Sequence, residues 1–190
     1  MHKELAFLFT CFAVLTACTK SVYLKKINGF LNAHSAEAKS RYMAEDYHGF
    51  FAERKGGGKD KATALRSFMN WDGPLEPDIK ILSYTKRDSV WTVVFNEQND
   101  FTKPIGFPGW KGATIVTFDK RGLIKETLYL PDDSNPPYRP YLQPALDWLT
   151  KNKPAELTEV FKDNKLVQTE ATANKWKALL QIWKMQTSAR

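Results

Sequence analysis

The sequence predicts an α+β fold in which an antiparallel sheet packs on helices that precede it and is followed by a helical tail. Apolar residues before and after the middle of the chain recur at helical spacing. The middle itself holds four runs with strand character, Ile79–Lys86, Ser89–Asn96, Gly112–Asp119 and Gly122–Pro131. A sheet with one apolar face needs a cover, and both helical regions are available to provide it.

Alternation within these runs defines the face that must be buried. Trp91, Val93 and Phe95 fall on one side of the second run, as the two-residue period of a strand requires. The connections at residues 86–89 and 119–122 are short and polar, and the second contains a glycine, which suits the positive φ of tight hairpins. We therefore expect antiparallel hairpins.

Three helices and one short strand are expected before the sheet. Serine and aspartate residues are favourable N-caps for the second and third helices. The expected bounds are Val22 to about Leu31, Ser35 to about Asp46 and Asp60 to about Met69, with an aromatic strand at residues 47–51 between the second and third helices.

The tail predicts three further helices, at Tyr138–Lys151, Pro154–Lys162 and Glu170–Gln186. In the last one, Trp176 and Trp183 share an apolar stripe that must be buried by packing onto the sheet domain, on a partner or second copy, or at a membrane interface. The long apolar connection Glu97–Lys111 either covers the mouth of a pocket or packs its own aromatic side chains on the sheet.

The first residues are typical of an export signal. An apolar run from Leu5 to Ala17 is too short to span a bilayer. It closes with Leu15-Thr16-Ala17-Cys18, which resembles a bacterial lipobox. The resemblance implies a signal peptide at residues 1–17, lipidation of Cys18 and a short tether at residues 18–24. An ordinary secretory signal or a weak transmembrane anchor are the alternatives.

The net charge of the mature chain indicates which kind of surface it contacts. Removing residues 1–17 takes away Lys3 and Glu4, which leaves 27 basic and 20 acidic residues and a net charge of +7. This excess favours an anionic surface, and for a lipid-anchored protein that surface is the membrane. Because Thr19 follows the cysteine instead of aspartate, the outer membrane of the cell envelope is favoured. No nucleic-acid module is visible.

With Cys18 lipidated, the mature chain has no free thiol, so disulfides and zinc–cysteine sites are not expected. Only His34 and His48 remain as histidines in the mature chain. We therefore expect no metal and no cofactor.

The order of elements resembles the nuclear transport factor 2-like fold, including its SnoaL-like and ketosteroid isomerase-like branches. The resemblance rests on Phe30-Leu31-Asn32-Ala33, on Tyr42-Met43-Ala44-Glu45-Asp46 and on the last hairpin from Phe118 to Ile124. It implies a cone-shaped curved sheet wrapped around helices over residues 25–132, followed by an extension at 133–190. The fold hosts enzymes, ligand carriers and interaction modules, so it names no function.

The resemblance implies that the isomerase chemistry is absent. It places Phe51 at the position of the carboxylate base, Ile27 at the tyrosine and Thr114 at the second oxyanion donor, and neither Phe nor Ile can transfer a proton. Glu53 replaces the base only if the strand register shifts. Asp46, His48 and Glu97 are the other acid–base candidates, although each also suits a purely structural role.

Although the isomerase residues are absent, the cone is expected to keep a lining of aromatic side chains. It suits a hydrophobic ligand, and it equally suits a core filled by its own side chains. The expected lining residues are Phe50, Phe51, Phe68, Trp71, Trp91, Phe95, Trp110, Phe118 and Tyr129.

The sequence thus favours a non-enzymatic, lipid-anchored module that binds a hydrophobic small molecule or a protein partner, which is either a second copy of the chain or another envelope protein. An acid–base enzyme and a structural component of an envelope assembly are the alternatives.

Overall fold

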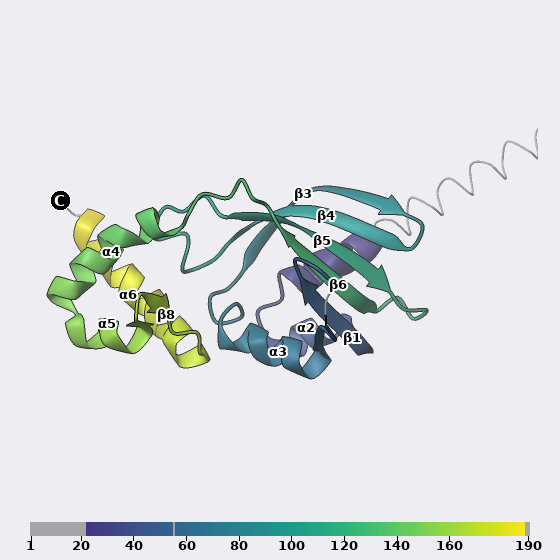
Figure 1. The fold of residues 1–190 in the computed structure, drawn as a ribbon, viewed down its shortest axis with the longest axis horizontal. Coiled ribbons are helices and arrows are strands. Elements are labelled where there is room, and N and C mark those ends of the chain that lie inside the picture. Colours follow the sequence, from purple (N-terminus) through teal and green to yellow (C-terminus); the bar gives the residue numbers. More distant parts are fainter. Residues whose placement is uncertain (1–21, 55, 189–190) are drawn as a thin grey trace, which may run out of the picture.

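The computed structural model describes residues 22–54 and 56–188, and they form an α+β fold (Figure 1). A curved six-stranded sheet has the order β2-β1-β6-β5-β4-β3. The four central predicted strands are confirmed with small changes in their ends. The strands of this sheet are β1 (Met43–Phe51), β2 (Lys59–Asp60), β3 (Asp78–Arg87), β4 (Val90–Gln98), β5 (Trp110–Phe118) and β6 (Ile124–Pro131).

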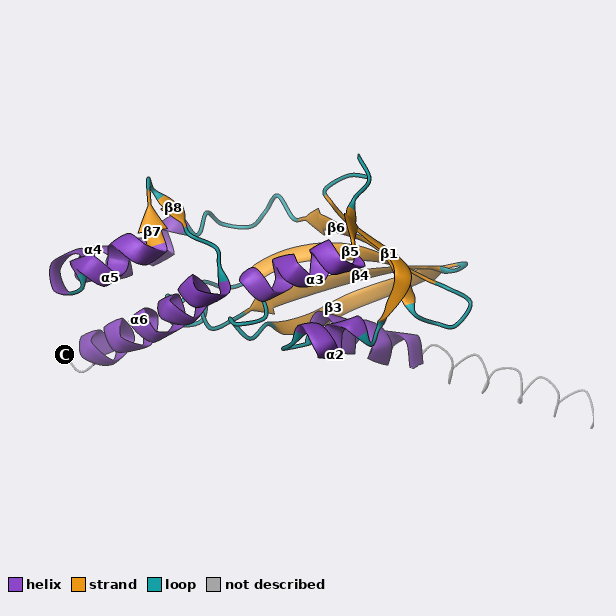
Figure 2. Cartoon of the chain, turned by 90° about the horizontal axis from the view of Figure 1, so that it is seen from below, coloured by secondary structure: helices purple, strands orange, loops and turns teal. Residues whose placement is uncertain are grey.

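Helices cover the concave face of the sheet (Figure 2). A helix over residues 22–31 comes first, as predicted. It is followed by α2 (Ala36–Ser40) and, after β1 and β2, by α3 (Lys61–Asn70). The predicted caps are present, because Ser35 accepts from Ala38 N at 3.1 Å and Asp60 accepts from Thr63 N at 2.8 Å.

Two sequence expectations are wrong in this region. The second helix ends at Ser40, not near Asp46, and Met43–Asp46 belong to β1. The sheet is also mixed, not wholly antiparallel, because β1 pairs with β6 in parallel. These two corrections share one cause: β1 finds its main partner about 80 residues along the chain, for example Gly49 opposite Thr127, and local periodicity does not reveal such a partner.

A first core lies between the helices and the sheet. It combines side chains from the helix over residues 22–31, from β1 and from the concave side of β3 to β6. Trp91, Val93 and Phe95 of β4 all belong to it, which confirms the face that their alternation predicted. The sheet face and the helices are therefore held together by one apolar layer.

A second core lies in the C-terminal region, where α4 (Arg139–Asn152), α5 (Pro154–Val160) and α6 (Glu170–Ser188) surround a small hairpin of β7 (Phe161–Lys162) and β8 (Lys165–Leu166). Buried residues from before the tail also enter this core, namely Leu75 and, from the connection between β4 and β5, Phe101, Ile105 and Phe107. The connection between β4 and β5 thus packs mainly on the tail. The expectation that its aromatic side chains pack on the sheet is therefore wrong.

The apolar stripe of α6 packs on the protein's own chain. Trp176 is fully buried, and its indole Nε1 donates to Val160 O at 3.1 Å. Trp183 is half-buried against the same core. The stripe is therefore buried within the protein itself, but in a second core formed mainly by the tail and not on the sheet, which corrects the first of the three alternatives in part.

No helix among the described residues is long and apolar enough to cross a membrane. The predicted signal peptide, the lipobox and Cys18 lie outside the described residues.

Candidate ligand-binding site

A cavity of about 500 Å³ opens between the concave face of the sheet and the helices. This volume is within the range of pockets that hold small molecules. The sheet supplies Phe95, Thr114, Thr127 and Tyr129, and the helical side supplies Phe30, Leu31, Ala64 and Phe68. The cavity is therefore mainly apolar, with walls that come from elements far apart in the sequence.

Three aromatic rings form one wall of the cavity. The Tyr129 ring lies between the other two, with its centroid 5.9 Å from that of Phe95 and 5.1 Å from that of Phe51. Phe95 is buried, whereas Phe51 is 69% exposed at the end of β1. The wall thus runs from the core to the solvent, and a ligand can reach it from the Phe51 end.

Lys39 brings an ammonium group into this apolar cavity. Its Nζ donates to Phe30 O at 2.8 Å, close to the C-terminal end of the first helix, where a positive charge is favourable. The same atom lies 4.1 Å from the ring centroid of Phe30 and 4.5 Å from that of Phe68. Burial lowers the pKa of Lys39 to about 8, against the opposing attraction of Asp72 and Glu97.

Two carboxylates share the cavity with Lys39. Burial, together with the negative charge of Asp72, raises the pKa of Glu97 to about 7. Burial of its carboxyl also raises the pKa of Asp72, although this residue as a whole is exposed at the rim after α3. Because the usual pKa of Glu is about 4.3, Glu97 titrates near neutral pH, as general acids and bases often do.

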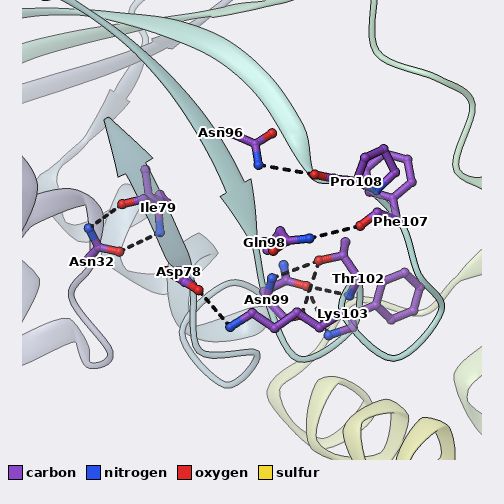
Figure 3. A network of polar contacts seen from close by, with 11 residues as sticks. Asn32, Asp78, Ile79, Asn96, Gln98, Asn99, Thr102, Lys103, Phe107 and Pro108 are labelled. Carbon is purple, nitrogen blue, oxygen red and sulfur yellow. Dashed lines mark hydrogen bonds and ion pairs between the residues drawn. The ribbon is translucent and has the colours of Figure 1, made fainter. Parts of the chain in front are cut away.

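The position of Glu97 follows from the strand and from the loop after it. Glu97 shares the parity of Trp91, Val93 and Phe95 on β4, so its side chain faces the concave side. The next residues are tightly held (Figure 3): Gln98 Nε2 donates to Phe107 O at 3.2 Å, and Asn99 Oδ1 accepts from Phe101 N and Thr102 N at 3.1 and 2.9 Å.

Gly109 allows the chain to return to the sheet beside Glu97. Its φ is +106°, and a Cβ atom there would lie 2.7 Å from Glu97 O and 2.5 Å from Asn96 Nδ2. Only glycine adopts this conformation at this distance without strain. The loop and Gly109 thus fix the end of β4 that carries Glu97.

The predicted aromatic lining divides into two groups. Phe50, Phe51, Phe68, Phe95 and Tyr129 line the cavity. The other four do not: Trp91 is 1% exposed in the first core and Phe118 packs against it, while Trp71 and Trp110 pack against the second core.

The acid–base candidates also separate. Glu97 lines the cavity, but Asp46 and His48 do not. Asp46 is exposed and pairs with Lys125 Nζ at 3.1 Å, which lowers its pKa, and exposed His48 contacts Gly57 O through Nδ1 at 3.1 Å. The three candidates therefore do not converge in the cavity, and Glu97 is the one of them that lines it.

The positions aligned with the isomerase residues hold no acid–base group. Ile27 is completely buried in the first core and does not line the cavity, whereas Phe51 and Thr114 do. Glu53 is exposed at the mouth.

Lys39 and Asp72 are site residues that no pattern in the sequence indicated. In the sequence, Lys39 follows a capped helix start, where lysine is an ordinary surface residue, and Asp72 stands in a helix-ending turn. Their role follows from packing: α2 turns Lys39 towards the rings of Phe30 and Phe68, and the turn after α3 brings Asp72 to the rim. Among the described residues, no cluster of His, Cys, Asp or Glu is arranged to hold a metal ion.

Comparison with known proteins gives likeness of fold only. No family model matches the chain, and no curated protein matches it. A solved nuclear transport factor 2-like protein of unknown function from Cytophaga hutchinsonii is 10% identical, with a TM-score of 0.44 over 62% of this chain and 92% of the other.

The Δ5-3-ketosteroid isomerase of Mycobacterium sp. is 13% identical, with a TM-score of 0.48 over 59% of this chain and 94% of the other. A putative polyketide cyclase from Sinorhizobium meliloti is 15% identical, with a TM-score of 0.43 over 55% and 93%. These likenesses concern the arrangement of the chain, and the chemistry of the cavity follows from its own residues.

Proposed function

We propose that this chain is a lipid-anchored envelope protein that binds a small, mainly apolar molecule in the cavity of the cone. The observation that carries the proposal is the cavity itself: about 500 Å³, with an aromatic wall and a few polar groups. Pockets for small molecules commonly combine these features. The anchor rests on the lipobox at Leu15-Thr16-Ala17-Cys18.

Two adjacent residues of β5 allow a matched test. Thr114 lines the cavity and is 4% exposed, whereas Ile115 points to the opposite face of the same strand. Thr114→Phe fills the cavity, and Ile115→Phe adds a similar volume outside it.

The measurement is native mass spectrometry of the chain from Thr19 onward, purified from its own host, together with titration by the neutral fluorescent probe N-phenyl-1-naphthylamine. We expect a retained molecule or saturable probe binding, weakened at least tenfold by Thr114→Phe and unchanged by Ile115→Phe. An empty protein without saturable probe binding contradicts the proposal, as does equal loss in both variants.

A second function is favoured by one observation, the pKa of about 7 at Glu97 inside the cavity. A carboxyl group with this pKa is suited to proton transfer on a bound molecule. If Glu97 catalyses such a step, the wild type and Glu97→Gln should retain chemically different molecules, related as product and precursor. The same molecule in both variants supports binding without catalysis.

A structural role in an envelope assembly receives less support. That alternative is favoured by exposed tryptophans on the last helix, but Trp176 is buried in the second core.

A further inference from the structure

Lys39 brings a primary amine into the apolar part of the cavity. Its side chain lines the cavity, and its Nζ lies against the rings of Phe30 and Phe68 and donates to Phe30 O at 2.8 Å. Within residues 22–54 and 56–188, Asp72 and Glu97 attract Lys39 only at longer range, and no carboxylate accepts a hydrogen bond from it. The amine is therefore held by a carbonyl oxygen and two rings instead of by an ion pair.

Lys177 shows the contrasting arrangement of a lysine with little exposure. Its side chain is 24% exposed, and its Nζ lies 2.6 Å from Asp100 Oδ2 and also contacts Glu76. Hydrogen bonds to these two carboxylates raise the pKa of Lys177. Lys39 has no such partner in the described part of the chain, and burial lowers its pKa to about 8. At pH 8 about half of Lys39 is therefore neutral, compared with less than about 1% of an ordinary lysine.

A neutral lysine amine in an apolar pocket is a nucleophile towards carbonyl groups. Its nitrogen attacks the carbonyl carbon of an aldehyde or a ketone, and the two hydrogens of the amine leave with the carbonyl oxygen as water. The product is an imine, with a C=N bond between the lysine and the bound molecule. This step needs no oxidant and no reductant.

The surroundings of Lys39 suit the product as well as the free lysine. When the imine nitrogen takes up one proton from solvent, it carries one N–H and a positive charge. It can therefore still donate to Phe30 O and lie against the rings of Phe30 and Phe68, as the ammonium group does.

The cavity has room for the rest of such a molecule. Its volume of about 500 Å³ lies between the helical side, which carries Lys39, and the aromatic wall of Phe51, Phe95 and Tyr129 on the sheet side. An apolar body is favourable along this wall. The exposed ring of Phe51 lies at the end that is open to solvent.

We propose that the cavity binds a small apolar aldehyde or ketone and holds it through an imine with Nζ of Lys39. The apolar body of the molecule lies along Phe51, Phe95 and Tyr129. This inference rests on the proposed function, since it names the class of molecule that the same cavity binds and the atom that holds it.

The aldehyde 2-naphthaldehyde tests this inference, because it joins one carbonyl group to an apolar body. The chain from Thr19 onward is used, since both cores lie within residues 22–188. It is incubated with the probe at pH 8, the imine is reduced to a stable amine with sodium borohydride, and the labelled residues are identified by peptide mass spectrometry. We expect labelling of Lys39 at a probe concentration at least roughly tenfold below that needed for any other amine.

The α-amino group of Thr19 is the internal reference in this experiment. Its usual pKa is about 7.7–8.0, close to that of Lys39. Labelling of Lys39 in excess of this reference therefore reports binding of the probe and not the low pKa alone. The alcohol 2-naphthylmethanol, which has the same rings without a carbonyl group, should compete with the aldehyde at Lys39 and leave the labelling of Thr19 unchanged.

Three variants place the reaction in the cavity. Lys39→Met removes the amine and keeps an apolar stem, so labelling above the Thr19 reference should disappear. Lys59→Met is the matched control, because Lys59 also lines the cavity but is exposed and donates to Ser67 Oγ at 3.1 Å. It should keep the labelling of Lys39. Thr114→Phe, which fills the cavity, should weaken that labelling at least roughly tenfold. Melting temperatures confirm that the variants are folded.

Two outcomes overturn the inference on labelling alone: Lys39 reacts no more readily than Thr19, or its labelling survives in Thr114→Phe. If N-phenyl-1-naphthylamine binds but the aldehyde leaves Lys39 unlabelled, the cavity binds ligands and the carbonyl inference fails. If that neutral probe does not bind either, the proposed function fails with it.

Discussion

The environment of Glu97 in the folded protein disfavours its ionised form, because burial and the charge of Asp72 raise its pKa. Its pKa is about 7 in the native state, while an unfolded glutamate titrates near 4.3. Between these two values the native state binds the proton and the unfolded state does not. The contribution of Glu97 to the free energy of unfolding therefore decreases as pH rises from about 4.3 to about 7, and it stays low above that.

Glu97→Gln should for this reason stabilise the protein at high pH. We expect a gain of about 2 kcal/mol at pH 8.5 and a much smaller one at pH 4.5, where Glu97 is protonated in the native state and still about 40% protonated in the unfolded state. Urea unfolding of wild type and variant at the two pH values measures the difference. A gain that is equal at both pH values would show that burial of the charge is not its cause.

Gly109 allows the backbone at the start of β5 to pack closely against the backbone of Glu97. Gly109→Ala should destabilise the protein by at least about 2 kcal/mol, because its φ is +106° and the new Cβ would meet the backbone oxygen of Glu97. Gly57→Ala is the control, since its Cβ meets no atom within 4 Å, and we expect a change within about 0.5 kcal/mol. Thermal unfolding compares them, and similar losses would contradict the steric argument.

At the scale of elements, the strands and helices that were predicted correctly are those determined by residues close together in the sequence. Alternation of Trp91, Val93 and Phe95 placed a strand and its buried face, and Ser35 and Asp60 marked two helix starts. Met43–Asp46 were assigned to a helix because their pairing with β6 depends on residues far along the chain.

The cavity residues were predicted only in part, because some of them are determined by strand alternation and others by packing between distant elements. Aromatic residues of the sheet were recognised by their parity, but the same reasoning included Trp91, which fills the core and leaves no room for a ligand. Lys39 and Asp72 reach the cavity only after α2 and α3 pack on the sheet. A pattern in the sequence does not distinguish such residues from ordinary surface charges.

The connection between β4 and β5 joins the sheet to the helical tail. Phe107 is 1% exposed, and its ring centroid lies 4.6 Å from that of Trp110 and 5.3 Å from that of Tyr141 on α4. The backbone oxygen of Phe107 also accepts from Gln98, next to Glu97. The tail and the site are therefore linked through this loop.

Phe107→Ala should destabilise the protein by about 3 to 5 kcal/mol, as other large truncations in a core do. Phe51→Ala is the contrasting change: its ring is 69% exposed at the mouth, so we expect little loss of stability but weaker binding of the neutral probe. Urea unfolding followed by circular dichroism and by tryptophan fluorescence checks both. A cone that kept its full stability in Phe107→Ala would show that the tail is an independent unit.

At the scale of the whole molecule, the beginning of the helix over residues 22–31 and the helical tail lie at opposite ends (Figures 1 and 2). The helix over residues 22–31 begins beside the β5–β6 turn, since Lys26 Nζ donates to Gly122 O at 2.6 Å and the Tyr23 ring centroid lies 4.7 Å from that of Phe118. The β3–β4 hairpin is also near, because the Trp91 ring centroid lies 6.0 Å from that of Tyr23 and 5.8 Å from Lys86 Nζ. The turns carry exposed basic residues, among them Lys86 and Lys120. We call this end, with residues 22–26, 86–89 and 119–122, the basic tip.

Under the proposed lipidation of Cys18, the basic tip faces the membrane. Val22 is the fourth residue after Cys18, and at no more than about 3.6 Å per residue the Cα atoms of the two lie within about 14 Å of each other. Basic side chains this near an anionic bilayer each contribute about 1 kcal/mol of attraction, which salt screens. The tip and the lipid would then act together, and the helical tail would project away from the surface.

This orientation predicts how charge changes act at the two ends of the molecule. Replacing Lys86 and Lys120 by Gln should weaken binding of the chain from Thr19 onward to vesicles with one-third phosphatidylglycerol by roughly tenfold or more at low salt. Replacing Lys162 and Lys165, in the β7–β8 hairpin of the tail, by Gln removes the same charge at the other end and should have a much smaller effect. Vesicle sedimentation measures both, and equal weakening in the two double variants would mean that net charge, and not the basic tip, determines the attraction.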